Sequence, residues 1–302
     1  MKLKLFLLTI FVSNMHLGAM PSDIYTSIIT KAFAEIDNGY LLKNHYEEIY
    51  KNFGMFIETI NDNEDLAKLI RETENKFLAD AELKDRYCQA PPSYRDPRKN
   101  PSKRHDKVYF QFVKEHYQLI QEEYPELLIK YPIIKMFLDS MLKLDEISKT
   151  LFLQALDKLE KDLPGIKEKI FGDYEELTVI SKIVRYEKSE KWGTTPHFDK
   201  SALTLIWDSS DPDNDCLLVC EDSNNPTMAA FKKPTRLFTN QDGKTSTLLI
   251  TGLALPEIDI NVSPTAHGVA PIKTEIRYAV ISFLLVPHLD MTKLQTDFIE
   301  KK

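Results

Sequence analysis

A histidine and an aspartate stand two positions apart, just before an apolar segment, in the stretch TTPHFDKSALTLIW at residues 194–207. Side chains at positions i and i+2 of a β-strand share a face, so this spacing would place His197 and Asp199 side by side. An imidazole and a carboxylate can both bind a metal ion. The pair is therefore a candidate for two-thirds of a metal site.

The same spacing occurs three times, so the spacing alone does not identify a site. With 7 histidines and 46 acidic residues in a chain of 302, about one His-x-acid pair is expected by chance. The pair at 45–47 opens a helical pattern, in which positions i and i+2 do not face each other. The pair at 288–290 comes near the end of the last predicted strand, and no histidine follows it. Only the pair at 197–199 precedes a predicted strand and has a later histidine, His267, in the same half of the chain.

His267 lies in the segment PTAHGVAPIKTEIRYAVISF. Pro271 and Lys273 predict the turn of a hairpin, with His267 on one arm and Arg277 on the other. Two histidines and one carboxylate on one face of a β-barrel are the ligand set of non-haem Fe(II) oxygenases, which leaves coordination positions open. Both O2 and an oxidisable co-substrate can then reach the metal. The predicted metal ligands are His197, Asp199 and His267.

Arg277 has a cationic guanidinium group. Burying this group inside a barrel costs free energy unless it pairs with an anion. A guanidinium binds a carboxylate through two parallel hydrogen bonds. A dicarboxylic co-substrate that chelates iron at one end would place its other carboxylate at Arg277. The alternative is an arginine at the rim of the barrel, paired with Glu275 or another surface acid.

The elements that must position these residues change in character along the chain. Apolar residues recur at helical spacing through residues 21–172, and the clearest helix is predicted between Phe137 and Leu159. A Pro-rich loop is predicted at 89–101, and the basic run at 95–107 is predicted to be solvated surface. After Gly172 the period becomes two, which predicts short strands. These strands are LTVISKIVRY, ALTLIW, CLLVC, TSTLLIT and IRYAVISFLLV. Their number and spacing favour an antiparallel barrel or jelly roll over residues 173–302.

The composition, 43% hydrophobic and 28% charged, is that of a globular protein with a core. A formal net charge of −7 argues against a general nucleic-acid or anionic-membrane binder. The cysteines Cys88, Cys216 and Cys220 are too few for a disulfide framework. The last two are predicted to be thiols of the core.

The stretch from 178 to 286 resembles the isopenicillin N synthase-like branch of the 2-oxoglutarate- and Fe(II)-dependent dioxygenases. The hallmarks of that family are a His-x-Asp followed by a strand, a distant histidine, and an arginine ten residues after it. The segment 197–199, His267 and Arg277 match these hallmarks. Tyr186 stands where the family has a tyrosine that hydrogen-bonds 2-oxoglutarate, and Gly252 stands at a family glycine.

The resemblance implies an α+β fold with a double-stranded β-helix (jelly-roll) core, a helical N-terminal region and supporting helices. It implies Fe(II) at the three predicted ligands and 2-oxoglutarate bound by Arg277 and Tyr186. The expected activity is the oxidation of a small organic substrate with O2, by hydroxylation, desaturation or ring closure. No nucleic acid or membrane partner is expected.

Two positions depart from the family pattern. The family usually has Arg-x-Ser, whereas Ala279 stands two residues after Arg277, and Val184 replaces an asparagine that often precedes the tyrosine. Loss of the serine hydroxyl should cost about 1–2 kcal/mol of co-substrate binding. Two alternatives therefore remain open: an Fe(II)/O2 oxidase of the same fold that does not use 2-oxoglutarate, and a non-catalytic metal-binding jelly roll.

The first 20 residues, MKLKLFLLTIFVSNMHLGAM, have the outline of a secretory signal peptide. Their apolar run is too short to span a bilayer. The alternative is an N-terminal extension that packs on the domain. Because 2-oxoglutarate and Fe(II) are intracellular reagents, the resemblance favours a cytoplasmic location, with export as the alternative if residues 1–19 are a signal peptide.

Overall fold

The computed structural model describes residues 43–96, 107–207, 216–220, 230–233, 247–258, 260, 262–287 and 289–291. The predicted signal peptide or extension at residues 1–20 lies outside these ranges, and so does His288 of the pair at 288–290. Within the described ranges, no helix combines the length and the apolar character that a membrane crossing requires.

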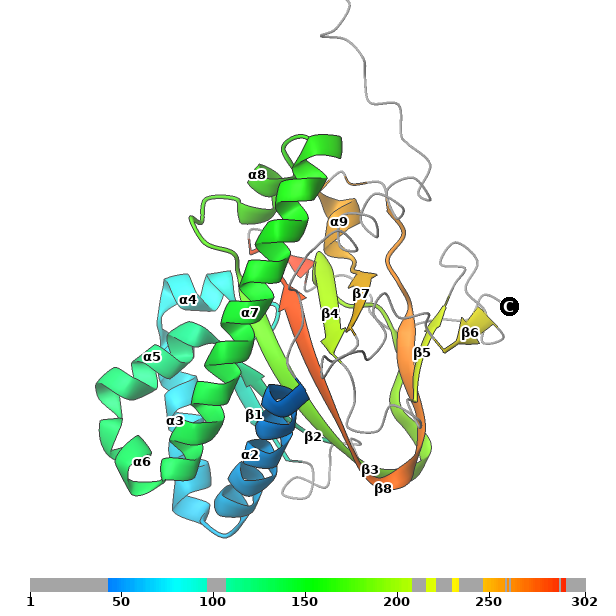
Figure 1. Ribbon diagram of the computed structural model, residues 1–302. Coiled ribbons are helices and arrows are strands. Elements are labelled where there is room, and N and C mark those ends of the chain that lie inside the picture. The colour runs from blue at the N-terminus through cyan, green and yellow to red at the C-terminus, as the bar shows by residue number, and fades with distance from the viewer. Residues whose placement is uncertain are drawn as a thin grey trace, which may run out of the picture.

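The helices form a layer on one face of the sheet (Figure 1). They are α2 (Lys43–Asn61), α3 (Glu64–Ala79), α4 (Ala81–Arg86), α5 (Lys114–Glu123), α6 (Pro125–Lys130), α7 (Pro132–Asp162) and α8 (Ile166–Phe171). The long helix α7 contains the helix predicted between Phe137 and Leu159. Its first residue is a proline, which suits a helix start because the N–H that proline lacks would have no partner there. Asn63 caps α3 by accepting a hydrogen bond from the Leu66 N–H at 3.0 Å.

The strands form one eight-stranded antiparallel sheet within the described residues. They are β1 (Ser93–Arg95), β2 (Lys107–Phe112), β3 (Val179–His197), β4 (Leu203–Trp207), β5 (Leu217–Cys220), β6 (Phe231–Lys232), β7 (Thr247–Thr251) and β8 (His267–Leu284), and a short helix, α9 (Ala254–Glu257), precedes β8. The main order is β1-β2-β3-β8-β4-β7, and β5 pairs with β6 and β8. The first two strands come from the region predicted to be mainly helical, and β1 lies within the predicted loop at 89–101.

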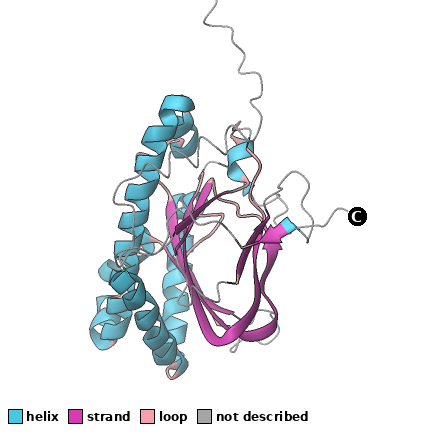
Figure 2. Ribbon diagram, turned by 45° about the vertical axis from the view of Figure 1, so that its right-hand side comes forward, coloured by secondary structure: helices cyan, strands magenta, loops and turns pink. Residues whose placement is uncertain are grey.

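The two long strands, β3 and β8, lie side by side and each takes part in two portions of the sheet (Figure 1). The first part of β3, up to Glu187, pairs with the second part of β8. After register shifts between Glu187 and Trp192, the second part of β3 pairs with the first part of β8, which also pairs with β5. Such bulges bend a strand, so the sheet curves without closing (Figure 2). The predicted α+β class with a jelly-roll core is confirmed.

The predicted hairpin around Pro271 is wrong, because His267 and Arg277 lie on the single strand β8. The two arms do not pair with each other, since each pairs with a different part of β3. Pro271 lies opposite Trp192, in the stretch where the register shifts. A proline removes one hydrogen bond of the ladder and is tolerated at a bulge. Here it accompanies a bend of the strand, not a reversal of the chain.

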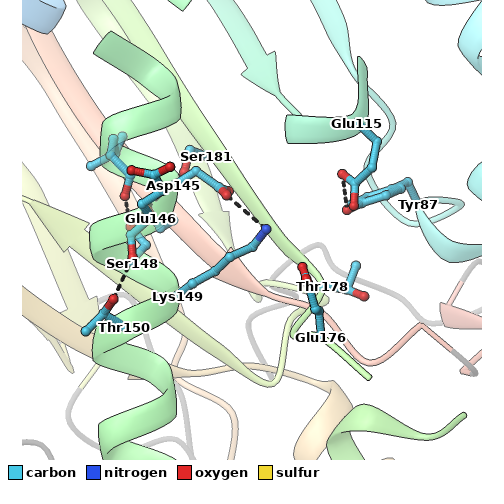
Figure 3. Close-up of polar contacts among 12 residues, drawn as sticks. Tyr87, Glu115, Asp145, Glu146, Ser148, Lys149, Thr150, Glu176, Thr178 and Ser181 are labelled. Atoms are coloured by element: carbon cyan, nitrogen blue, oxygen red, sulfur yellow. Dashed lines mark hydrogen bonds and ion pairs between the residues drawn. The ribbon is translucent and has the colours of Figure 1, made fainter. Parts of the chain in front are cut away.

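A polar network crosses the apolar interface between α7 and the sheet. Ser148 of α7 shares a hydrogen bond of 2.7 Å with Ser282 of β8, and the Trp207 indole N–H donates to the Ser282 hydroxyl at 3.3 Å. Ser181 of β3 also contacts Ser282, at 3.4 Å, and faces this part of α7 (Figure 3). All four residues are buried, so the network sets the position of α7 against β3, β4 and β8.

Alternation along β8 separates the two faces of the sheet. Tyr278 faces the helices, where its ring stacks on Tyr50 of α2 with a centroid distance of 5.2 Å. The neighbouring residues Arg277 and Ala279 face the other side and line a cavity. Because successive strand residues point to opposite faces, the helical layer supports one face and leaves the other for a site.

Candidate metal centre and its pocket

The structure brings the three predicted metal ligands together. His197 is the last residue of β3, Asp199 lies in the connection to β4, and His267 is the first residue of β8. His197 and His267 are directly opposite in the register, with ring centroids 4.4 Å apart. One ligand atom from each of the three residues lies within 4.8 Å of the others.

The sequence argument for the His197–Asp199 pair was right about proximity and wrong about its cause. Asp199 belongs to no strand, so the alternation of strand side chains does not align it with His197. The chain turns after β3 instead, and Asp199 Oδ1 lies 3.6 Å from His197 Nε2. Its other oxygen, Oδ2, lies 3.5 Å from His267 Nε2. The carboxylate therefore bridges the space between the two imidazoles.

Backbone carbonyls orient both imidazoles for metal binding. His197 Nδ1 lies 2.9 Å from the Thr195 carbonyl oxygen, and His267 Nδ1 lies 3.2 Å from the Thr265 carbonyl oxygen. A carbonyl only accepts, so each Nδ1 carries the proton and each Nε2 presents a lone pair. A hydrogen bond at the remote nitrogen is the usual support of a metal-binding histidine. The two lone pairs face Asp199.

Asp199 is held by the strand and turn that pack beneath it. Its Oδ2 accepts a hydrogen bond of 2.8 Å from the Thr204 hydroxyl on β4. Its backbone oxygen accepts from the Leu253 N–H at 2.8 Å, just after β7. A Cβ added at Gly252 would lie 2.0 Å from the Ser201 carbonyl oxygen, so only glycine allows this close approach. The Asp199 segment is thereby fixed to the β7–α9 turn.

The protonation states of the buried ligands suit a divalent cation. Burial lowers the pKa of His267 to about 4, so its imidazole is neutral at pH 7. Burial opposes ionisation of Asp199, but the adjacent imidazoles and the Thr204 hydroxyl outweigh it and hold the pKa of Asp199 well below its usual range. Neutral imidazoles and an ionised carboxylate are the forms that bind metals. The His197 side chain is 27% exposed, so the centre opens on its side.

A cavity of about 90 Å³ adjoins the three ligands. Apart from them, its lining consists of Lys107, Lys182, Val184, Tyr186, Thr194, Ile206, Leu217, Val269, Arg277, Ala279, Ile281 and Phe283. Most of these residues come from the face of β3 and β8 that the helices leave uncovered. The two residues predicted to bind a co-substrate, Arg277 and Tyr186, are both among them.

Arg277 is a buried arginine of this cavity and not an arginine of the rim. Its side chain is 2% exposed, and its Cζ lies 5.3 Å from the centroid of the Tyr186 ring, which is directly opposite in the register. Glu275, the alternative partner considered from the sequence, pairs instead with Lys188 at 3.1 Å. A buried guanidinium in a cavity is a position for an anionic ligand.

The two departures from the family pattern meet in the structure. Val184 and Ala279 are directly opposite each other on β3 and β8, and both line the cavity. They lie in one apolar cluster with Tyr186 and Val269. The cavity wall beside Arg277 is therefore apolar where the family has a serine hydroxyl.

The sequence did not identify Lys107 and Lys182 as cavity residues. Lys107 was included in the basic run predicted to be solvated surface, whereas it begins β2 and donates a hydrogen bond of 2.7 Å to Thr194. Positions 97–106 of that run lie outside the described residues. Lys182 lies four residues before Tyr186, so alternation places both on one face of β3. A lysine within an otherwise apolar strand was the signal that could have identified it.

Neither cysteine of the segment 216–220 lies at the metal centre, since the cluster of candidate ligands contains only the three predicted residues among those described. Cys220 is buried, as predicted for a core thiol. Cys216 is half-buried, and its Sγ lies 3.5 Å from the Pro271 carbonyl oxygen.

No protein-family model and no curated protein sequence matches the chain. Among solved structures, a protein from Shewanella oneidensis that is designated an oxygenase has a TM-score of 0.52 at 16% identity, over 88% of this chain and 87% of that one. Dioxygenase for auxin oxidation 1 from Arabidopsis thaliana, in its 2-oxoglutarate complex, has a TM-score of 0.46 at 17% identity, over 73% and 79% of the two chains. The dioxygenase for auxin oxidation of rice has a TM-score of 0.45 at 14% identity, over 74% and 70%. The chain shares the fold of the Shewanella protein.

Proposed function

We propose that the protein is a non-haem Fe(II)- and 2-oxoglutarate-dependent oxygenase of the isopenicillin N synthase-like family, which oxidises a small organic substrate. One observation carries the proposal. A facing set of two imidazoles and one carboxylate opens into the same cavity as a buried arginine. This is the donor set that leaves coordination positions open for O2 and a chelating co-substrate. The fold shared with a protein designated an oxygenase supports it.

The chain's own residues divide the work of such a reaction. His197, Asp199 and His267 would hold the metal, and Fe(II) with 2-oxoglutarate supplies the activation of O2 when bound. Arg277 would bind the remote carboxylate of the co-substrate through paired hydrogen bonds. The hydroxyl of Tyr186, which lies 3.2 Å from the Thr194 hydroxyl, would add a further hydrogen bond.

The apolar lining completes the site. Val269, Ile281 and Phe283 line the cavity beside the ligands. Apolar walls exclude water and strengthen the interaction between Arg277 and a bound carboxylate. We assign the chemistry to residues 173–302, with β2 of the preceding region supplying one wall through Lys107.

A second candidate follows from Ala279. An Fe(II)/O2 oxidase of this fold would use the same three ligands but would bind the carboxylate of its substrate, and not 2-oxoglutarate, at Arg277. The apolar wall of Val184 and Ala279 favours this alternative, because it removes a hydroxyl that the family uses for the co-substrate.

An anaerobic titration with Fe(II) and then 2-oxoglutarate separates the two candidates. The proposed function predicts a visible iron-to-ketoacid charge-transfer band, and its loss in His267→Ala. Iron binding without a band would favour the oxidase. Absence of iron binding by the wild-type protein would leave only the fold in common with the oxygenases.

A further inference from the structure

The cavity beside the metal centre holds more positive charge than a single co-substrate would neutralise. Its lining contains three cations, Lys107, Lys182 and Arg277, whereas Asp199 is its sole carboxylate among the described residues. If a divalent metal and the dicarboxylate 2-oxoglutarate are added, two positive charges remain uncompensated. Uncompensated charge in an enclosed site is costly and attracts an anion.

The two lysines approach the cavity from adjacent strands. Lys107 of β2 is directly opposite Tyr186 of β3, and its Nζ lies 5.8 Å from the centroid of the Tyr186 ring. Lys182 lies on the same face of β3, and its Nζ lies 4.3 Å from the centroid of the Tyr109 ring. The only hydrogen bond of either ammonium among the described residues is the one from Lys107 to Thr194. Neither lysine forms an ion pair within the described part of the chain.

Burial disfavours the charged form of both lysines. It lowers the pKa of Lys107 to about 8, and it lowers the pKa of Lys182 to about 8 with a further contribution from the charge of Lys107. Both side chains are half-buried, so their charged forms are only partly solvated. A carboxylate bound in the cavity that both lysines line would replace the lost hydration with charge-assisted hydrogen bonds.

We infer that Lys107 and Lys182 form an acid-binding position for the primary substrate, and that this substrate is therefore an organic carboxylate. The inference rests on the proposed function, because it assigns Arg277 to the co-substrate and the lysine pair to the molecule that is oxidised.

The test separates the lysines from Arg277 by titration. Anaerobic Fe(II) protein is titrated with 2-oxoglutarate, and the charge-transfer band is followed in Lys107→Met, Lys182→Met and Arg277→Met. We expect the Kd for 2-oxoglutarate to change by less than about threefold in the lysine variants and to rise by more than about tenfold in the arginine variant. A tenfold or larger rise in either lysine variant would assign the lysines to the co-substrate and overturn the inference.

A second step tests the acid directly. The Mn(II)–2-oxoglutarate form, which does not turn over, is mixed at millimolar concentration with simple aliphatic and aromatic carboxylates, each beside its own primary amide. We expect the carboxylates to raise Tm and the amides not to. Equal shifts with the amides, or no shift with any carboxylate, would overturn the inference.

Variants of Lys182 and Lys188 test whether the rise in Tm that carboxylates cause depends on the cavity lysines. The shift should vanish in Lys182→Met, persist in Lys182→Arg, and be unchanged in Lys188→Met, whose exposed lysine pairs with Glu275 outside the cavity. If Lys182→Met does not fold, the comparison of acids with amides on the wild-type protein still decides. A wild-type protein that forms no charge-transfer band contradicts the proposed function itself, so the two failures are distinguishable.

Discussion

Arg277 is the single residue on which co-substrate binding should depend most. Its guanidinium is buried, lies opposite Tyr186 and cannot share its role with a serine, because position 279 is alanine. Lysine keeps the charge and loses the paired hydrogen bonds. We expect Arg277→Lys to weaken 2-oxoglutarate binding by about tenfold to a hundredfold, as loss of a charged hydrogen bond would. The charge-transfer titration measures this, and Fe(II) affinity should stay unchanged; an unaltered Kd for 2-oxoglutarate would remove Arg277 from the co-substrate site.

Ala279 offers the reverse experiment on a single side chain. Ala279→Ser restores the hydroxyl that the family places two residues after the arginine, on the cavity side of β8. One added hydrogen bond to a carboxylate should strengthen 2-oxoglutarate binding by up to about tenfold, since it contributes about 1 kcal/mol. The same titration reports it. Weaker binding in the variant would mean that the carboxylate does not approach position 279.

The Asp199 segment of the candidate metal centre packs closely on the β7–α9 turn. Gly252→Ala would place a Cβ 2.0 Å from the Ser201 carbonyl oxygen and 3.0 Å from the Asp199 carbonyl oxygen. One of the two segments must move. We expect Fe(II) affinity to fall by at least about tenfold, because Asp199 is displaced from the imidazoles, and unfolding stability to fall by about 1–3 kcal/mol.

Gly54→Ala is the matched control, because Gly54 lies in α2 and an added Cβ would meet only the Tyr278 hydroxyl, at 3.4 Å. That variant should keep its Fe(II) affinity and gain slightly in stability, since alanine is the better helix former. Metal titration and thermal unfolding of both variants give the comparison. Equal Fe(II) affinities would show that the turn does not position Asp199.

For the molecule as a whole, stability should depend on a buried glutamate between the helical layer and the edge of the sheet. Glu74 of α3 accepts a hydrogen bond from the Tyr94 N–H of β1 at 2.5 Å, and burial raises its pKa to about 7. The folded protein therefore binds this proton more tightly than the unfolded chain does. The contribution to the free energy of unfolding is complete below the unfolded pKa and is lost as pH rises through 7.

Glu74→Gln should remove this dependence, because glutamine keeps the acceptor oxygen for Tyr94 and does not ionise. We expect the stability difference between variant and wild type to grow in favour of the variant by roughly 3 kcal/mol between pH 4 and pH 8. Denaturant unfolding across this range measures it. Taking the difference cancels the other buried titrating groups, among them Asp145 and His116, whose pKa values burial also shifts. Parallel profiles would contradict the assignment.

Sequence reasoning reached the three candidate metal ligands and Arg277 from residue types, from the short spacings 197–199 and 267–277, and from the family resemblance that joins them. Alternation along a strand puts Arg277 and Ala279 on one face, and period two marked the strands of the β half. It failed at Pro271, where a proline signals either a turn or a bulge. The choice between them depends on which strand pairs with the segment, and that is not a local property.

The order of residues was enough to predict five strands of the β half, the candidate ligands and the resemblance that joins them, but it did not predict β6 or α9. The folded chain was needed to establish the pairing of β3 with β8, which sets His197 opposite His267. It was also needed to show that Lys107 of β2 lies opposite Tyr186 of β3. The difference arises because strand alternation and helical spacing follow from backbone geometry over a few residues. Strand register depends instead on contacts between segments far apart in the chain, and it is the bends in β3 and β8 that gather two imidazoles, one carboxylate and three cations around one cavity.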